Sequence, residues 1–472
     1  MKGITFFILL VSFSSLHSQP VTLRDTTNQY DYIIITVPEF VNACEPFRQH
    51  KETVRDFRTL IVDTTQIYAE FDSSAAPEDN IRDFVSYAGT FWKEPRPKFF
   101  LIVGTVSDVP NFQIPFPSQP TVYFHSDYYY CQNIYENDTI ITDFLLGRIP
   151  CKDETEINNY FFKVMGYETN DTIYSWMNNA LFLCAGEDAS NLNYINYALG
   201  IATSLPSYIR PFYIAENDTS QYYGTIDSIY KAINQRGNAV VWLLGLGDDP
   251  YIGGSDWITI EDLNGFTNQD KYFFTFSSGR QSAILDTNTN LTKAMMTLPD
   301  AGSLGGCVFV GYTYYTIGHL FESNWASRIF DPLINSIGEA MISDNFPIGG
   351  LYDYVRKVAN LWADPSLKLK YDTTVGVEKV ADEIPQGFTL YQNYPNPFNP
   401  ITTIKFALPV DSRVKINVYN SLGQLVETLA DKELESGYHE INFEASGLAS
   451  GVYLYQVQAG EYASVKKMIL IK

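Results

Sequence analysis

The chain has 472 residues, 45% of them hydrophobic, and a formal net charge of −22. This length exceeds what a single hydrophobic core usually holds and predicts two or three domains. The acidity excludes a nucleic-acid partner, because binding to phosphates depends on clustered lysine and arginine side chains. Residues 385–472 hold seven basic and eight acidic side chains, so the preceding part of the chain carries nearly all of the negative surplus.

The N-terminus has the features of a cleavable signal peptide. Lys2 supplies a positive charge, an apolar run extends from Ile4 to Val11, and small polar residues continue to Ser18. We therefore expect residues 1–18 to be removed on export. The run is too short for a membrane anchor, which needs roughly 20 apolar residues, and no other segment is long and apolar enough to cross a bilayer.

The part of the chain from residue 28 to residue 370 is predicted to be an α/β body. Short apolar runs, several of them ending in glycine, are typical of buried parallel strands: Tyr32–Val37, Phe99–Gly104, Ala180–Gly186, Val240–Gly245, Tyr272–Ser278 and Cys307–Gly311. Helical spacing of apolar residues is found between them, at 77–92 and 153–168. The alternation occurs twice and predicts two sub-domains, 28–172 and 173–370, each with a mostly parallel sheet flanked by helices. Ligands of such sheets bind at the carboxyl ends of the strands.

The five cysteines are scattered along the chain, and none has the spacing of a zinc site: Cys44, Cys131, Cys151, Cys184 and Cys307. We expect them to be small buried core residues. A single disulfide between Cys131 and Cys151 is left open, because an exported protein meets an oxidising compartment.

The C-terminal part changes character. Residues 371–384 have the composition of a linker, and residues 385–472 form a module with several prolines followed by short alternating runs. We expect strands at 403–407, 414–419, 439–443, 452–456 and 464–471. This spacing predicts an antiparallel, immunoglobulin-like sandwich.

The motifs of this module resemble the type A sorting domain of the type IX secretion system of Bacteroidota and related bacteria. The matching segments are Tyr391–Pro400 (YQNYPNPFNP), Val418–Asn420, Leu422–Gln424, Leu448–Tyr453 (LASGVY) and Lys466–Lys472. The resemblance implies that the outer-membrane translocon reads the module and that the protein reaches the surface or the outside of a Gram-negative cell. It also implies that the module is often removed during release or attachment to lipopolysaccharide. The alternative is a generic immunoglobulin-like adhesion domain.

The body resembles the gingipain-like cysteine peptidases. The matching residues are spread over about 30–369: Tyr30–Thr36, Ile67–Tyr68, Phe71, Ile81–Phe84, Phe99–Gly104, Asp127–Tyr130, Asp143, Gly147–Pro150, Glu156, Tyr167–Glu168 and Ala363–Leu367. Two positions depart from the family pattern, Thr105 in place of aspartate and Ala363 in place of glycine. The resemblance implies a caspase-like fold; relatives make calcium binding plausible, and no other cofactor is expected.

Members of this family cleave peptides with a cysteine–histidine dyad at two neighbouring strand ends. Aligned on the family pattern, the histidine position between two glycines is Leu246 and the cysteine position is Gly279. The spacing between them is kept by Trp257, Thr259, Leu263 and Asn268. Leucine cannot accept a proton and glycine has no nucleophile, so this resemblance implies an inactive dyad.

Other residues could in principle replace the dyad. Cys307 or Cys184 could act as a displaced nucleophile, but both lie in buried-strand patterns, and His319 is more typical of surface or packing. Ser277 or Ser278 would each need a base. Asp248 and Asp249 could act as a weak base or bind a cation, whereas solvated turn residues are the simpler reading, and His50 and His125 fall in no catalytic motif.

The sequence therefore favours an exported pseudopeptidase that acts in binding or surface display, with a peptide or protein as its ligand. The alternatives are an active cysteine endopeptidase with a displaced dyad and a surface structural protein.

Overall fold

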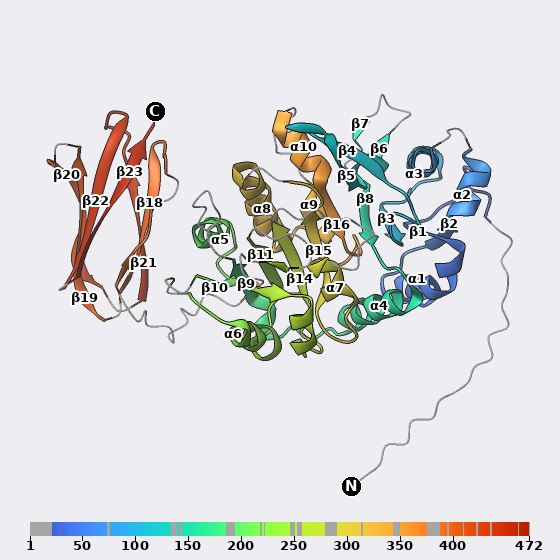
Figure 1. Cartoon of the computed structure of the whole chain (residues 1–472), viewed down its shortest axis with the longest axis horizontal. Coiled ribbons are helices and arrows are strands. Elements are labelled where there is room, and N and C mark those ends of the chain that lie inside the picture. The colour runs from blue at the N-terminus through green and yellow to red at the C-terminus, as the bar shows by residue number, and fades with distance from the viewer. Residues whose placement is uncertain are drawn as a thin grey trace, which may run out of the picture. The chain divides into compact units, whose positions relative to one another are not determined.

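A computed structural model describes most of the chain (Figure 1). The described residues are 21–72, 76–133, 139–140, 144–185, 194–217, 220, 222–245, 251–252, 257–278, 290–312, 315–342, 350–374, 388–393, 396–408, 410–421, 423–434, 437–460 and 462–471. The expected signal peptide, residues 1–18, lies outside them, as does most of the expected linker. The chain divides into two compact units, Met1–Asp372 and Thr373–Lys472.

The first sheet of the body has four parallel strands in the order β2-β1-β3-β8. Their bounds are β1 (Tyr32–Thr36), β2 (Thr59–Asp63), β3 (Phe99–Val103) and β8 (Leu145–Ile149). Buried side chains of α1 (Val41–Val54) and α4 (Glu154–Thr169) cover one face, and those of α2 (Thr64–Glu70) and α3 (Pro77–Phe91) cover the other. Helix α3 begins with Pro77 as expected, and Asp153 caps α4 by accepting a hydrogen bond from the Glu156 backbone N–H.

The second sheet has six strands in the order β10-β9-β11-β14-β15-β16, and only β16 runs antiparallel to its neighbour. Its strands are β9 (Asn179–Cys184), β10 (Arg210–Ala215), β11 (Val240–Leu244), β14 (Phe273–Ser278), β15 (Ser303–Phe309) and β16 (Ala359–Trp362). Helices α5 (Tyr194–Ala202) and α8 (Tyr315–Ile329) pack on one face, and α6 (Ile226–Tyr230) and α7 (Leu291–Thr297) on the other.

Strand β15 begins four residues before the strand expected at 307–311. Two glycines hide its start from the apolar pattern. A Cβ atom at Gly306 would lie 2.1 Å from the Thr275 hydroxyl oxygen, so glycine here serves a close approach between strands and is not a break.

Shorter elements complete the body. They are the hairpin β4 (Phe112–Phe116) and β5 (Gln119–Ser126), the strand pairs β6 (Gln132–Asn133) with β7 (Thr139–Ile140) and β12 (Tyr251–Ile252) with β13 (Ile258–Thr259), and the helices α9 (Ile337–Met341) and α10 (Gly350–Val358).

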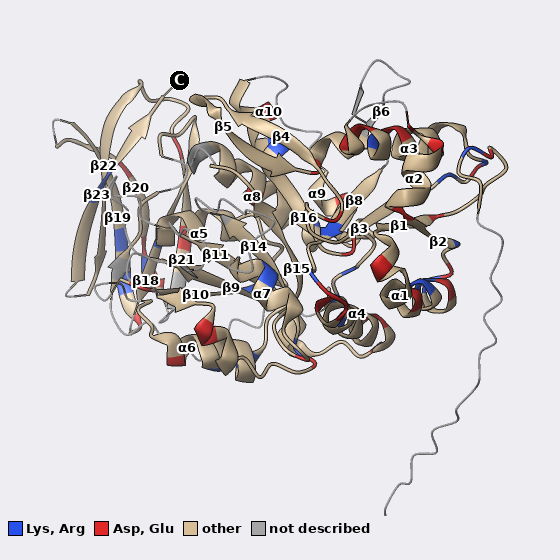
Figure 2. Ribbon diagram, turned by 45° about the vertical axis from the view of Figure 1, so that its right-hand side comes forward, with Lys and Arg blue, Asp and Glu red and all other residues tan. Residues whose placement is uncertain are grey.

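One hydrophobic core runs between the two sheets of the body. It joins Tyr32 and Leu101 of the first sheet to Phe182, Trp242 and Phe276 of the second. Charged residues lie mainly on helices and loops of the body, whereas β1, β3, β9, β11, β14 and β15 contain none (Figure 2). The uninterrupted burial of β1, β3, β9 and β11 confirms the expectation of parallel strands covered on both faces.

The C-terminal unit is an antiparallel β-sandwich of the immunoglobulin-like type. A three-stranded sheet, β17-β18-β21, faces a four-stranded sheet, β20-β19-β22-β23. The bounds are β17 (Thr389–Leu390), β18 (Ile401–Leu408), β19 (Ser412–Asn420), β20 (Leu425–Leu434), β21 (Gly437–Glu444), β22 (Gly451–Ala459) and β23 (Tyr462–Leu470). Strand β20 was not expected, because its residues are exposed or half-buried and therefore show no apolar alternation. In the described part of the chain, no helix has the length and hydropathy needed to span a membrane.

Candidate functional site at the strand ends of the second sheet

The carboxyl ends of β9, β11 and β14 meet at one edge of the second sheet. The strand register pairs Leu244 with both Cys184 and Ser278. Beyond the strands, the backbone N–H of Ala185 donates to the carbonyl of Leu244 at 2.8 Å. This edge is where open α/β sheets bind their ligands.

The two positions that the sequence assigns to the family dyad follow these strand ends. Leu246 comes two residues after the end of β11 and Gly279 directly follows β14, and both lie outside the described residues. Asp248 and Asp249 also lie outside them.

The residues that keep the family's spacing between the two strand ends all have packing or hydrogen-bonding roles. The Trp257 indole donates to the carbonyl of Gly224 at 3.2 Å, and the Thr259 hydroxyl donates to Asp262 at 2.8 Å. Leu263 is buried. Asn268 is also buried, and its side chain accepts from the N–H of Gly302 at 2.8 Å and donates to that residue's carbonyl at 2.9 Å. These contacts give all four residues structural roles between the two strand ends.

The cysteines give little support to a displaced nucleophile. Burial raises the pKa of the Cys307 thiol well above its usual value, and the nearby Glu322 carboxylate adds to the effect. Burial alone raises the pKa of Cys184, and only 1% of that residue is exposed. A thiol becomes a nucleophile when its pKa is lowered, so both sites have the opposite environment.

The thiols of the other three cysteines also have raised pKa values. Burial raises the pKa of both Cys44 and Cys131 to about 12, and that of Cys151 rises well above its usual value. All five cysteines are free thiols, so the disulfide left open between Cys131 and Cys151 is absent from the structure. Their role as core residues accords with the sequence expectation, although Cys131 is only half-buried.

The candidate bases are engaged elsewhere. His319, on α8, packs edge-on against the Tyr197 ring and lies 3.3 Å from the Ser323 hydroxyl, and burial lowers its pKa. His50 contacts Glu168 at 2.8 Å, and His125 contacts Asn111 at 2.9 Å.

The serines of β14 also lack an observed base. Ser277 is buried, and its hydroxyl makes no hydrogen bond within the described chain. The side chain of Ser278 lies outside what is described. No group of three or more His, Cys, Asp or Glu side chains suited to a metal ion occurs among the described residues.

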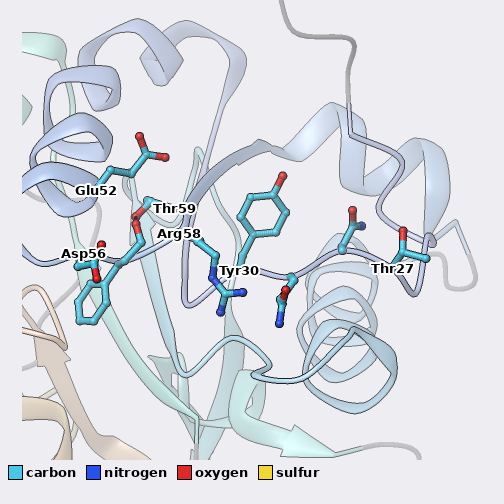
Figure 3. A pocket seen from close by; sticks show the side chains of 9 residues that line it. Thr27, Tyr30, Glu52, Asp56, Arg58 and Thr59 are labelled. Atoms are coloured by element: carbon cyan, nitrogen blue, oxygen red, sulfur yellow. Dashed lines mark hydrogen bonds between the residues drawn. The ribbon is translucent and has the colours of Figure 1, made fainter.

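A separate pocket of about 490 Å³ opens at the amino ends of β1 and β2, at the sheet edge opposite the strand carboxyl ends (Figure 3). It is lined by Thr27, Asn28, Gln29, Tyr30, Glu52, Asp56, Phe57, Arg58 and Thr59. The Arg58 guanidinium is already bound by Asp31 at 2.6 Å, and Glu52 pairs with Arg48. The labelled polar groups in Figure 3 are spread along the pocket and do not converge on one point.

In the C-terminal module, two of the motif segments lie together on the edge of β23. The Gln392 side chain donates to the carbonyl of Lys467 at 2.6 Å, and the Asn396 side chain accepts from the N–H of Ile469 at 2.8 Å. Phe398 continues this edge through its own backbone, accepting from Ile471 at 3.0 Å and donating to Ile469 at 2.9 Å. The first and last motifs of the module therefore form one structural unit.

Two family models match the chain. The model for peptidase family C25 matches residues 25–370, and the model for a secretion system C-terminal sorting domain matches residues 392–472. A search of curated proteins found no match.

Several solved structures share the fold. The complex of the RgpB pro- and mature domains of Porphyromonas gingivalis is 15% identical with a TM-score of 0.58, and the match covers 93% of this chain and 100% of that one. The Arg-specific cysteine proteinase gingipain R (RgpB) is also 15% identical with a TM-score of 0.58, with 93% of this chain and 98% of that one covered. At this identity the likeness establishes the caspase-like gingipain fold, and the activity of those proteins is not transferred by it.

Proposed function

The chain belongs to peptidase family C25, and we propose that it is a member without the cysteine–histidine chemistry of that family. We propose that it acts instead as a binding or display protein. Its C-terminal unit is a type IX sorting domain, and the protein is exported by that route to the cell surface or the extracellular space. The finer proposal, a pseudopeptidase, rests on the alignment of Leu246 and Gly279 with the two dyad positions of the family.

The loss of both groups removes the chemistry rather than weakening it. In such a dyad the imidazole takes the thiol proton and leaves a nucleophilic thiolate. Loss of a nucleophile or its base typically lowers the rate by on the order of a millionfold, and the two losses are not additive. The raised pKa values of Cys184 and Cys307 support the proposal, because neither thiol is prepared to take over.

A body without this dyad can still bind a peptide. The strand-end edge of the second sheet is the part of the fold that would hold a peptide in an active relative, and an extended peptide is the ligand that we propose here. The support for this ligand is the analogy of fold with peptidases of the family. A structural role on the surface is the competing function, and it predicts self-association of the purified protein without peptide binding.

The test uses the full mature chain, a thiol-reactive peptide electrophile and a mixed-peptide cleavage library. We expect the unmodified protein to show neither labelling nor cleavage. The variant Leu246→His with Gly279→Cys should gain labelling, whereas Leu246→His alone should not. Labelling of the unmodified protein that disappears with Cys307→Ser or Cys184→Ser would overturn the proposal and establish a displaced dyad.

A second measurement addresses binding. Fluorescent peptides from the same library are titrated against the unmodified chain and followed by anisotropy, while its mass in solution is measured by light scattering. Saturable binding by a monomer supports peptide binding. Self-association without binding would favour the structural role.

A further inference from the structure

The last 14 residues of the body, 359–372, contact both sheets, and we call them the closing segment. It begins as β16, which pairs with β15 of the second sheet through Trp362 opposite Gly306. It then passes directly over β8 of the first sheet. A Cβ atom at Gly147 would lie only 2.0 Å from the carbonyl oxygen of Ala363, so this crossing requires glycine in β8.

The body has two halves, the first sheet with its helices and the second sheet with its helices. The closing segment places a buried carboxylate between them. Asp364 is fully buried and accepts from the Lys51 ammonium at 2.6 Å and from the Tyr32 hydroxyl at 2.7 Å. Lys51 is also fully buried and donates to both oxygens of Glu168 at 2.8 Å. A buried charge that loses its partner strongly destabilises the fold, so Lys51 and Asp364 depend on each other.

The same segment is tied to the second half through its backbone. The N–H of Ile337 donates to the carbonyl of Leu367 at 2.7 Å, and that of Gly338 donates to the carbonyl of Pro365 at 3.0 Å. The Tyr160 hydroxyl, from α4, accepts from the N–H of Asp364 at 2.8 Å and donates to the carbonyl of Leu304 in β15 at 3.0 Å. Contacts to both halves therefore meet at Asp364 and the residues that follow it.

The segment ends in an anchor. The Lys370 ammonium donates to the carbonyls of Tyr167, at 2.6 Å, and of Asn170 at the end of α4. The backbone of Asp372 forms two hydrogen bonds with the Asn178 side chain, at 3.0 and 2.8 Å. The second compact unit begins at the next residue.

We infer that the closing segment is a clasp: it joins the two halves of the body through Asp364, and its anchor at Lys370 and Asp372 isolates that joint from the C-terminal module. The body would then withstand cleavage of the linker or a pull on the module, and it would open in both halves when the joint itself is weakened. This inference does not depend on whether the strand-end site is active.

The experiment uses the full mature chain with a specific protease site inserted after Val380. Thermal unfolding of the body is measured before and after cutting, and hydrogen exchange is followed in β1 and β15. We expect cutting to leave the Tm of the body unchanged. Asp364→Asn should lower that Tm by roughly 5–10 °C and should raise exchange at least about tenfold in β1 and β15 together.

Controls keep the result interpretable. Asp353→Asn removes a half-buried carboxylate of α10 that pairs only locally with Arg356 among the contacts described, and it should change neither strand. If Asp364→Asn does not fold, Ser366→Ala removes only the hydroxyl that donates to both oxygens of Asp364, at 2.9 and 3.2 Å, and should give a smaller shift in the same two strands. Faster exchange in one half alone, or a fall in Tm on cutting, would overturn the clasp.

Discussion

Two regions of the body differ in how they use polar residues. In the first half of the body, and where that half meets the closing segment, charges are buried and paired: Arg148 with Asp127, and Lys51 with Asp364 and Glu168. At the strand ends of the second sheet, the two positions that the sequence aligns with the family dyad are leucine and glycine. The first region holds side chains that are costly to bury, whereas the two aligned positions of the second carry no group that could act as a base or a nucleophile.

This difference separates the fold from the activity. A buried ion pair adds little net stability over apolar residues of the same shape, but removing one partner is severe. Loss of either partner therefore destabilises the fold whether or not the protein is an enzyme. Several residues that carry the resemblance to peptidase family C25 hold the body together, among them Asp127, Arg148, Glu168 and Asp364. Their presence therefore indicates the fold and does not indicate whether the protein is active.

The largest loss of stability is expected when the Asp127–Arg148 pair is broken. Arg148 is fully buried, binds both Asp127 oxygens at 2.7 Å and donates to the carbonyls of Gly104 and Val109 at 3.0 Å. Asp127→Ala leaves the guanidinium buried without its counter-charge and should lower the free energy of unfolding by about 3–5 kcal/mol. Urea denaturation measures this loss.

The matched control removes an exposed pair. Asp431→Ala takes away the partner of Arg413 on the surface of the C-terminal module, and it should leave the unfolding midpoint of that module unchanged. If Asp127→Ala were equally silent, the proposed contrast between the two regions would fail.

The next effect depends on pH and concerns Lys163 of α4. This ammonium is buried and donates to the carbonyls of Ala301 and Met295 at 2.7 and 3.2 Å, and burial lowers its pKa to about 7. Between pH 7 and about 10 the unfolded chain holds a proton that the folded chain has released, so this residue makes stability rise with pH, by at most about 1.4 kcal/mol per unit.

The measurement compares the free energy of unfolding of wild type and Lys163→Met as a function of pH. The five thiols have an opposing effect on the pH dependence, and it cancels in this comparison because both proteins contain them. Their raised pKa values contribute stability that is lost as pH rises above about 8. We expect any advantage of the methionine variant at pH 6 to shrink steadily up to pH 9. A difference that does not vary with pH would mean that Lys163 is charged in the fold throughout this range.

Much of the fold could be predicted from the sequence, because buried parallel strands leave continuous apolar runs. Strands β1, β3 and β11 start where expected and end within one residue of the expected ends. Strands without such a run were missed: β20 is exposed along its length, and β10 is mostly half-buried. The start of β15 was misplaced, because glycine there reflects crowding between strands.

The site was predictable only in part, for a different reason. Residue type indicates that Leu246 and Gly279 can supply neither a base nor a nucleophile, but it does not indicate which partner binds. The contact of Lys51 with Asp364 joins residues 313 positions apart, and neither residue stands in a motif with the other. Only the fold brings them together.

A smaller effect is expected in the C-terminal module. Asn396→Ala removes the acceptor of the Ile469 N–H at the edge of β23 and should lower the stability of the module by about 1–2 kcal/mol. The body should be unaffected, because it is a separate compact unit. Ser446→Ala, at an exposed turn, serves as the control, and differential scanning calorimetry resolves whether one transition moves or both.

The smallest expected effect is the most informative about activity. Four of the five thiols are buried and all five have raised pKa values, so a disulfide reagent at pH 7 should react slowly with half-buried Cys131 and with the other four only after unfolding. Rapid reaction at pH 6 would require a thiolate stabilised by a nearby positive charge. If Cys307→Ser abolished such a reaction, Cys307 in β15 would be a reactive nucleophile. The contrast between the two regions would then no longer describe this protein.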